Sequence, residues 1–276
     1  MKIISVMNQK GGVGKTTTSV NLAAGLVRAG KQVLLIDADL QGNATSALGV
    51  VCKQKNDVEC DLFALLTNQC NIQDALISRE IKNKNKKMTL DLIPATIALS
   101  GFDQLVRAIP NKQLLLKQML QDVDAYYDYV LIDCPPSLGL MTINALVASD
   151  EVLIPVQPEF FGLQGVSQLM DTIDSLQKSM NPQLAICGVV CTRFNRRNIH
   201  NEVLSCLQDK FEKGLFATKI HENIAVAEAP SFGKTIFEYN ENCSGSYDYD
   251  LLSKEFINRD IKNMAMPVIK EKMLER

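Results

Sequence analysis

Three glycines and two lysines lie within six residues near the start of the chain, in the run Lys10-Gly11-Gly12-Val13-Gly14-Lys15, which Thr16 and Thr17 follow. Because glycine has no Cβ, such a backbone can curl and direct several N–H groups at one point. A helix that begins here adds the partial positive charge of its N-terminus. Ammonium groups and a threonine hydroxyl beside these N–H groups suit a polyphosphate and a Mg²⁺ ion.

The flanks of this run predict a strand before it and a helix after it. Residues 3–7 are mostly apolar, and residues 20–27 place apolar side chains at helical spacing. In this context Lys15 is expected to reach the β- and γ-phosphates and Thr16 to ligate Mg²⁺. The strict phosphate-loop pattern has glycine where this chain has Gln9, and a second lysine, Lys10, opens the loop. The alternative, a glycine-rich turn with surface lysines, fits these flanks less well.

Two further apolar runs end in acidic residues. Residues 32–37 end at Asp37 and residues 129–133 end at Asp133, as is typical of central parallel strands that deliver their last residues to a ligand-binding edge. Asp133 is expected to hold Mg²⁺ through a water next to Thr16. Asp37 either holds Mg²⁺ through a water or anchors its loop, and Asp39 is in a position to orient a water near a γ-phosphate. The alternative is that one of these two acids only caps the following turn.

The composition predicts one globular α/β domain over residues 1–276, with the tail from about 264 left open. The chain is 46% apolar and 22% charged, and its net charge of −2 gives no overall field that would attract nucleic acid. Its eight cysteines are scattered without a C-x-x-C pair, as in a reducing compartment. The sequence offers neither a signal peptide nor a membrane span, so we expect a cytoplasmic protein.

The stretch 10–17, with its leading lysine, resembles the deviant Walker-A ATPases: the ParA/Soj partition proteins, MinD and, more distantly, nitrogenase iron protein and arsenical-pump ATPases. The stretches 37–45, 128–139, 157–165 and 220–234 resemble further family motifs and occur in family order. The resemblance implies a doubly wound, mostly parallel sheet with helices on both faces. It also implies ATP with Mg²⁺ as cofactors, and a subunit dimer in which Lys10 reaches the partner's nucleotide. In the family the second aspartate of the first switch, here Asp39, is needed for hydrolysis, and Leu40 replaces the usual proline.

The stretch 220–234 resembles the family segment that lines the adenine pocket. By this resemblance Asn223 contacts adenine, and the backbone of His221 takes the place of the family's proline. Glu222 and Ala225 stand where the family usually has arginines that are associated with DNA binding. Their presence predicts weaker contacts to DNA phosphates, or a transfer of those contacts to the three arginines Arg193, Arg196 and Arg197 or to the C-terminal lysines.

The resemblance implies an ATP-dependent homodimer that hydrolyses ATP and is stimulated by a ParB-like centromere-binding protein. Its output would be segregation of chromosomal or plasmid DNA, with nucleoid association if DNA binding is retained. The alternative is a MinD-like or cargo-positioning ATPase. Membrane attachment is not expected, because acidic residues offset the charge of the mildly amphipathic tail. An ATP-dependent synthase would need further catalytic groups, and the sequence offers no such constellation.

Two stretches have more than one interpretation. The basic stretch 79–87 is interpreted as a solvated hairpin or crossover, with a DNA contact as the alternative. Phe160 and Phe161 are either exposed aromatics at a dimer face or core residues.

Overall fold

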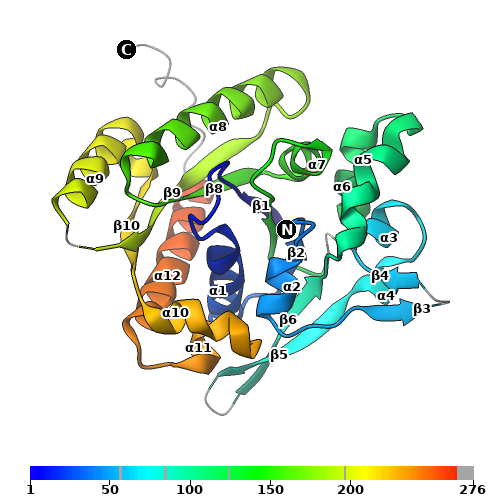
Figure 1. The fold of residues 1–276 in the computed structure, drawn as a ribbon, viewed down its shortest axis with the longest axis horizontal. Coiled ribbons are helices and arrows are strands. Elements are labelled where there is room, and N and C mark those ends of the chain that lie inside the picture. The colour runs from blue at the N-terminus through cyan, green and yellow to red at the C-terminus, as the bar shows by residue number, and fades with distance from the viewer. Residues whose placement is uncertain (56–57, 84–85, 124, 196, 266–276) are drawn as a thin grey trace.

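Eight strands form one sheet in the order β10-β9-β8-β1-β7-β2-β6-β5 (Figure 1). The computed structural model describes residues 1–55, 58–83, 86–123, 125–195 and 197–265. Neighbouring strands are parallel except β5 and β6, and β3 and β4 form a separate antiparallel pair. The strands are β1 (Lys2–Val6), β2 (Val33–Asp37), β3 (Lys53–Lys55), β4 (Val58–Cys60), β5 (Ile77–Asn83), β6 (Lys86–Ile93), β7 (Tyr129–Asp133), β8 (Glu151–Val156), β9 (Ala185–Phe194) and β10 (Leu215–His221).

Helices cover both faces of this sheet, which confirms the predicted doubly wound architecture. Figure 1 shows α7 and α8 on one side, and α1 and α12 on the other. The α-helices are α1 (Lys15–Arg28), α2 (Asn43–Ala47), α3 (Leu62–Leu66), α4 (Ile72–Ala75), α5 (Phe102–Leu105), α6 (Leu115–Gln121), α7 (Leu140–Ala148), α8 (Phe160–Ser179), α9 (Asn198–Phe211), α10 (Ile224–Glu228), α11 (Ile236–Tyr239) and α12 (Ser244–Ala265). Short 3₁₀ turns include η5 (Ala229–Phe232).

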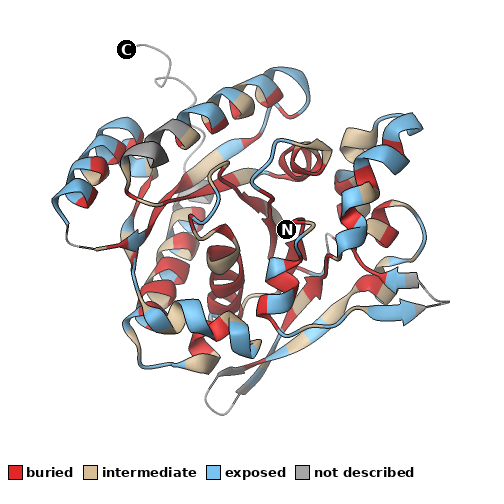
Figure 2. Ribbon diagram, in the orientation of Figure 1, coloured by how far each residue is buried: buried red, intermediate tan, exposed pale blue. Residues whose placement is uncertain are grey.

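The central strands are buried on both faces, as their unbroken apolar sequences predict. Every residue of β2 and β7 is buried. Leu34 and Ile36 of β2 pack into one hydrophobic cluster, whereas Val33 and Leu35 pack into another on the opposite face. Figure 2 shows α1 almost entirely buried between the sheet and its neighbouring helices. This double layer fixes the edge at which the parallel strands end.

The described residues of the basic stretch 79–87 lie in two antiparallel strands, with Ile77 opposite Leu92 and Asn83 opposite Lys86. The hairpin interpretation is therefore confirmed, although Arg79 is turned into the protein and its side chain is 16% exposed. Among the described residues, no helix combines the length and apolarity needed to cross a bilayer.

Candidate nucleotide-binding site

The loop between β1 and α1 has the backbone conformation that its glycines predict. Gly12 and Gly14 have φ angles of 75° and 83°, in the left-handed region where other residues are strained. Gly14 caps α1 without a side-chain hydrogen bond, so the first N–H groups of the helix point into the loop. Asn8 holds the loop, because its Oδ1 accepts from Lys10 N at 3.0 Å and its Nδ2 donates to Pro155 O at 2.8 Å. The result is a cradle of N–H groups suited to phosphate.

Lys15 lies inside this cradle. Its ammonium is largely buried and donates to the Lys10 carbonyl at 3.4 Å. Burial lowers the pKa of Lys15, and the charges of Asp133 and Asp39 counteract part of that effect. A phosphate placed against this ammonium would supply the compensating negative charge that a desolvated cation requires.

Asp133 comes from the carboxyl end of β7 and has one oxygen without a partner. Its Oδ1 accepts from Ser19 Oγ at 2.9 Å, while its Oδ2 is buried and unpaired among the described residues. Burial, followed by the charge of Asp37, raises the pKa of Asp133 to about 7, although the nearby hydroxyls of Thr16 and Ser19 oppose the shift. An unpaired buried carboxylate oxygen beside a threonine hydroxyl fits a hydrated Mg²⁺ ion.

Asp37 lies next to Asp133, since the two residues are in register in adjacent strands. Its Oδ2 accepts from the N–H and the hydroxyl of Thr45, at 2.8 and 2.7 Å, and its Oδ1 accepts from Asp39 N at 3.2 Å. Burial raises the pKa of Asp37 to about 6. These contacts match the loop-anchoring alternative for Asp37, whereas its role as a Mg²⁺ ligand stays a prediction.

The Thr45 hydroxyl gives a first testable prediction. It donates to Asp37 and accepts from Ala95 N at 3.0 Å, both in the interior. Thr45→Val keeps the shape but leaves both partners without this bond, so we expect a loss of about 1–3 kcal/mol in the free energy of unfolding. Chemical denaturation would measure it. Thr45→Ser, which retains the hydroxyl, should lose much less, and equal losses in the two variants would contradict the hydrogen-bond explanation.

Asp39 begins the turn that follows strand β2. Its carboxylate accepts from Gln41 N at 3.1 Å and its carbonyl from Gly42 N at 2.9 Å. The side chain is buried, and its charge acts on Lys15. The structure thus brings Asp39, Asp133 and Lys15 together at one edge of the sheet, which is the arrangement that the sequence predicted.

Lys10, unlike Lys15, lies at the rim of the loop. Its Nζ pairs with Glu159 Oε2 at 2.8 Å, and this contact lowers the pKa of Glu159. Gln157 Nε2 donates to the other carboxylate oxygen of Glu159 at 2.8 Å. Exposed ion pairs of this kind contribute at most about 1 kcal/mol, so another anion can replace Glu159. Phe160 and Phe161 follow directly, and their side chains lie outside the described residues.

The residues predicted to contact adenine lie at the carboxyl end of β10. Asn223 caps α10 by accepting from Val226 N at 3.3 Å, and its Nδ2 donates to Ser244 Oγ at 2.8 Å. His221 N donates to Asp248 Oδ2 at 2.8 Å. The adjacent strand β9 reaches the phosphate loop. The contact of Asn223 and His221 with adenine stays a prediction.

Sequence reasoning missed two contacts of the loop. Ser19 lies one helical turn after Lys15, so helical spacing could have placed it beside the loop. Thr192 Oγ1 donates to Val13 O at 2.7 Å and thereby fixes the end of β9 against the loop. Its only sequence signal was a polar residue at the end of an apolar strand.

The arginines at the end of β9 and directly after it are partly neutralised. Arg193 Nη2 lies 3.6 Å from Glu222 Oε1, and Asn195 Nδ2 donates to Glu222 Oε2 at 3.4 Å. Arg197 is exposed, and Arg196 lies outside the described residues. Glu222 therefore stands in the place of a family arginine and, in addition, forms an ion pair with Arg193.

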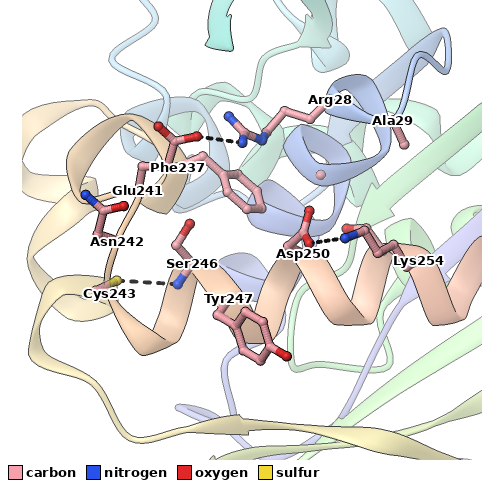
Figure 3. Close-up of a pocket in the computed structure, with 12 residues that line it drawn as sticks. Arg28, Ala29, Phe237, Glu241, Asn242, Cys243, Ser246, Tyr247, Asp250 and Lys254 are labelled. Atoms are coloured by element: carbon pink, nitrogen blue, oxygen red, sulfur yellow. Dashed lines mark hydrogen bonds and ion pairs between the residues drawn. The ribbon is translucent and has the colours of Figure 1, made fainter. Parts of the chain in front are cut away.

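A separate pocket of about 600 Å³ lies at the far end of α1, between α11 and α12 (Figure 3). Its charged side chains pair with one another: Arg28 with Glu241 at 3.0 Å, and Lys254 with Asp250 at 2.6 Å. Since α1 rises about 1.5 Å per residue over 14 residues, this pocket lies about 20 Å along the helix from the loop.

Comparison with known proteins agrees with this geometry. A family model described as an AAA domain matches residues 1–186. Sporulation initiation inhibitor protein Soj of Bacillus subtilis is 46% identical over 92% of this chain and 97% of its own length. Chromosome partitioning protein ParA of Myxococcus xanthus is 42% identical over 94% and 89%. Cobyrinic acid a,c-diamide synthase from Mycobacterium smegmatis, solved with an ATP analogue and magnesium, is 29% identical, with a TM-score of 0.79 over 98% of this chain and 100% of that chain.

The fold and the lysine-led phosphate loop define an ATPase of the deviant Walker-A class. Within that class, the chain belongs to the ParA/Soj family of partitioning ATPases.

Proposed function

We propose that this ATPase is a switch for DNA segregation: it pairs with a second copy of itself around ATP and separates after hydrolysis. The observation that carries the proposal is the different placement of the two loop lysines. Lys15 is buried in the cradle, whereas Lys10 lies at the rim in an exchangeable pair with Glu159. A lysine at the rim can serve a nucleotide bound by another subunit. The partitioning role of the relatives Soj and ParA supports the same function.

Binding follows from the groups at the strand edge. The N–H groups of residues 11–17 and the Lys15 ammonium would hold the phosphates of ATP, and Thr16 with Asp133 would hold Mg²⁺, which neutralises charge on the phosphates. Asp39 would accept a hydrogen bond from the attacking water and so align it with the γ-phosphate. Lys10 of the second subunit would stabilise the charge that develops in the transition state. The family's ParB-like partner would then act on this pair as a stimulator.

DNA binding can be tested through the Arg193–Glu222 pair. Glu222→Gln removes the anion and frees Arg193, so we expect about two- to fourfold tighter ATP-dependent DNA retention at low salt. The slope of log affinity against log salt should steepen by about one. Gel shifts with ATP, with ADP and without nucleotide would measure both. Arg193→Ala combined with Glu222→Gln should lose the gain. A gain that persists in this double variant would show that Arg193 is not the contact.

The pairing of Glu222 with Arg193 also favours a second candidate function, an ATP-dependent dimer that positions a membrane or cytoplasmic cargo. Here DNA retention should be independent of nucleotide in both the wild type and Glu222→Gln. Sedimentation with anionic liposomes in the presence of ATP would then separate a membrane cargo from a cytoplasmic one.

A further inference from the structure

Arg79 belongs to the basic hairpin, but only 16% of its side chain is exposed, and it takes no part in the phosphate loop. Its guanidinium lies against Glu238, whose side chain is 9% exposed. An arginine that is largely withdrawn from water requires hydrogen bonds around its planar fork, so the groups that it contacts indicate what it holds together.

The guanidinium joins three segments that are distant in the sequence. Nε donates to the Leu48 carbonyl at 2.7 Å, and Nη2 donates to the Gly233 carbonyl at 2.8 Å. Nη1 donates to both carboxylate oxygens of Glu238, at 3.1 and 2.9 Å. Arg79 therefore links the end of α2, the turn after η5 and helix α11 to strand β5.

The first of these segments belongs to the loop that carries Asp39. Leu48 caps the C-terminus of α2, and Thr45 of the same helix binds Asp37. Next to Leu48, the backbone approaches the turn after η5 closely: a Cβ on Gly233 would lie 2.7 Å from Gly49 Cα. Both glycines have positive φ angles, of 64° and 62°. Arg79 closes this contact by binding the carbonyls on its two sides.

The other two segments lead to the first turn of α1. Glu238 completes a capping box with Thr235, and the next N–H group, of Ile236, donates to Asn21 Oδ1 at 2.8 Å. Asn21 Nδ2 in turn donates to the Thr17 carbonyl at 2.8 Å. Hydrogen bonds and short stretches of backbone thus connect the phosphate-binding end of α1 with the loop of Asp39, and Arg79 is the central member of this series.

We propose that Arg79 is a positioning residue for ATP hydrolysis, which keeps the 37–48 loop at a fixed distance from the phosphate loop. The inference rests on the proposed role of Asp39 in aligning the water. The hydrogen bonds of Arg79 go to Leu48, Glu80, Gly233 and Glu238, all of which lie outside the phosphate loop, so its loss should change turnover more than nucleotide affinity.

The test compares Arg79→Ala and Arg79→Lys in steady-state ATP hydrolysis and in ADP binding with Mg²⁺. We expect kcat to fall about tenfold or more in Arg79→Ala, since small displacements of an aligning group have large effects on rate. The affinity for ADP should change by less than about threefold. Arg79→Lys should not restore kcat, because a compact ammonium on a flexible stem lacks the planar fork that reaches Leu48, Gly233 and Glu238 from three separate nitrogens.

Arg259→Ala is the matched control. Arg259 also forms a fork, with Nη2 donating to the Leu215 carbonyl and to Glu255 Oε1 at 2.8 Å, and its side chain is 24% exposed. Its contacts join α12 to β10 and the turn before it, away from the loop of Asp39. Arg259→Ala should lower the thermal stability as Arg79→Ala does, but leave kcat per folded molecule unchanged. Equal kcat values in the two variants would overturn the inference.

Asp39→Asn in the same assay separates the two proposals. If Asp39→Asn is inactive and Arg79→Ala turns over like the wild type, the inference on Arg79 is wrong while the role of Asp39 stands. If Asp39→Asn retains full turnover, the proposed role of Asp39 is wrong, and so is the inference that rests on it.

Discussion

Lys10→Ala is expected to abolish ATP-dependent pairing and to lower ATP turnover at least about a hundredfold, while a single chain still binds nucleotide. The ammonium of Lys10 lies at the rim and pairs with Glu159, so it contributes little to the cradle around Lys15. A cation supplied from outside to a γ-phosphate is worth about 10³–10⁵ in rate in comparable phosphoryl transfers. Light scattering with a slowly hydrolysed ATP analogue would measure pairing, and phosphate release would measure turnover.

The variant Glu159→Gln tests the ion pair of Lys10 with Glu159 separately from the positive charge of Lys10 itself. The variant removes the anion but keeps a hydrogen-bonding side chain and leaves Lys10 intact. We expect the variant to form the ATP-dependent dimer at least as readily as the wild type. The reason is that Lys10 must leave Glu159 to reach the partner's nucleotide, and the substitution weakens the Lys10–Glu159 contact. Normal pairing and normal turnover in Lys10→Ala would eliminate the two-subunit switch. The protein would then act as a nucleotide-binding domain in which Lys10 is a surface residue.

The local parts of the site follow from the sequence, because they depend on short-range chemistry. The loop of residues 10–15 needs glycines at positive φ, and a short apolar run that ends in an acid, such as 129–133, is typical of a strand that is covered on both faces. The carboxyl ends of such strands meet at one edge, so the convergence of Asp39, Asp133 and Lys15 was predictable.

The long-range pairs were not predictable in this way. Asp37 and Asp133 are adjacent because β7 lies between β1 and β2, an order that depends on how the helices pack. Arg79 seemed solvated because its neighbours are polar and charged. Its burial depends on Gly233 and Glu238, which are more than 150 residues away. The pair between Lys10 and Glu159 spans 149 residues. Contacts of this kind have no local pattern in a single sequence.

Because Asp37 and Asp133 are adjacent at the strand edge, we expect one substitution to raise stability and lower turnover. Asp133→Asn is expected to stabilise the protein without nucleotide at pH 8 and to lower Mg²⁺-dependent ATP turnover. The pKa of Asp133 is raised to about 7 and that of Asp37 to about 6, in both cases mainly by burial. At pH 8 the wild type must therefore keep two desolvated carboxylates charged side by side.

The dependence of stability on pH follows from these values. An unfolded aspartate has a pKa of about 3.9, so between about pH 4 and pH 7 the folded protein binds more protons than the unfolded chain. The free energy of unfolding therefore decreases as the pH rises through this range, and it levels off above it. Asp133→Asn removes one of the two groups, whose pKa is raised to about 7, so this decrease should shrink by on the order of 4 kcal/mol over the whole range.

Urea denaturation at pH 5, 6, 7 and 8, without Mg²⁺ or nucleotide, would measure this difference. Asp174→Asn, which changes an exposed aspartate on α8, is the control and should leave the pH dependence as in the wild type. An Asp133→Asn variant that is less stable than the wild type at pH 8 would mean that the carboxylate is compensated in the folded state.

With Mg²⁺ and ATP the effect of Asp133→Asn should reverse, because the unpaired Oδ2 of the wild type then gains a partner that a neutral amide cannot replace. The wild type should regain stability when both are added, whereas the variant should gain little from Mg²⁺ beyond its gain from ATP alone. Turnover should fall about 10- to 100-fold, as expected for a group that holds a metal through its water. Loss of turnover together with a gain in metal-free stability would assign the carboxylate to the metal rather than to folding. If the carboxylate served packing alone, its replacement would lower both the metal-free stability and the turnover.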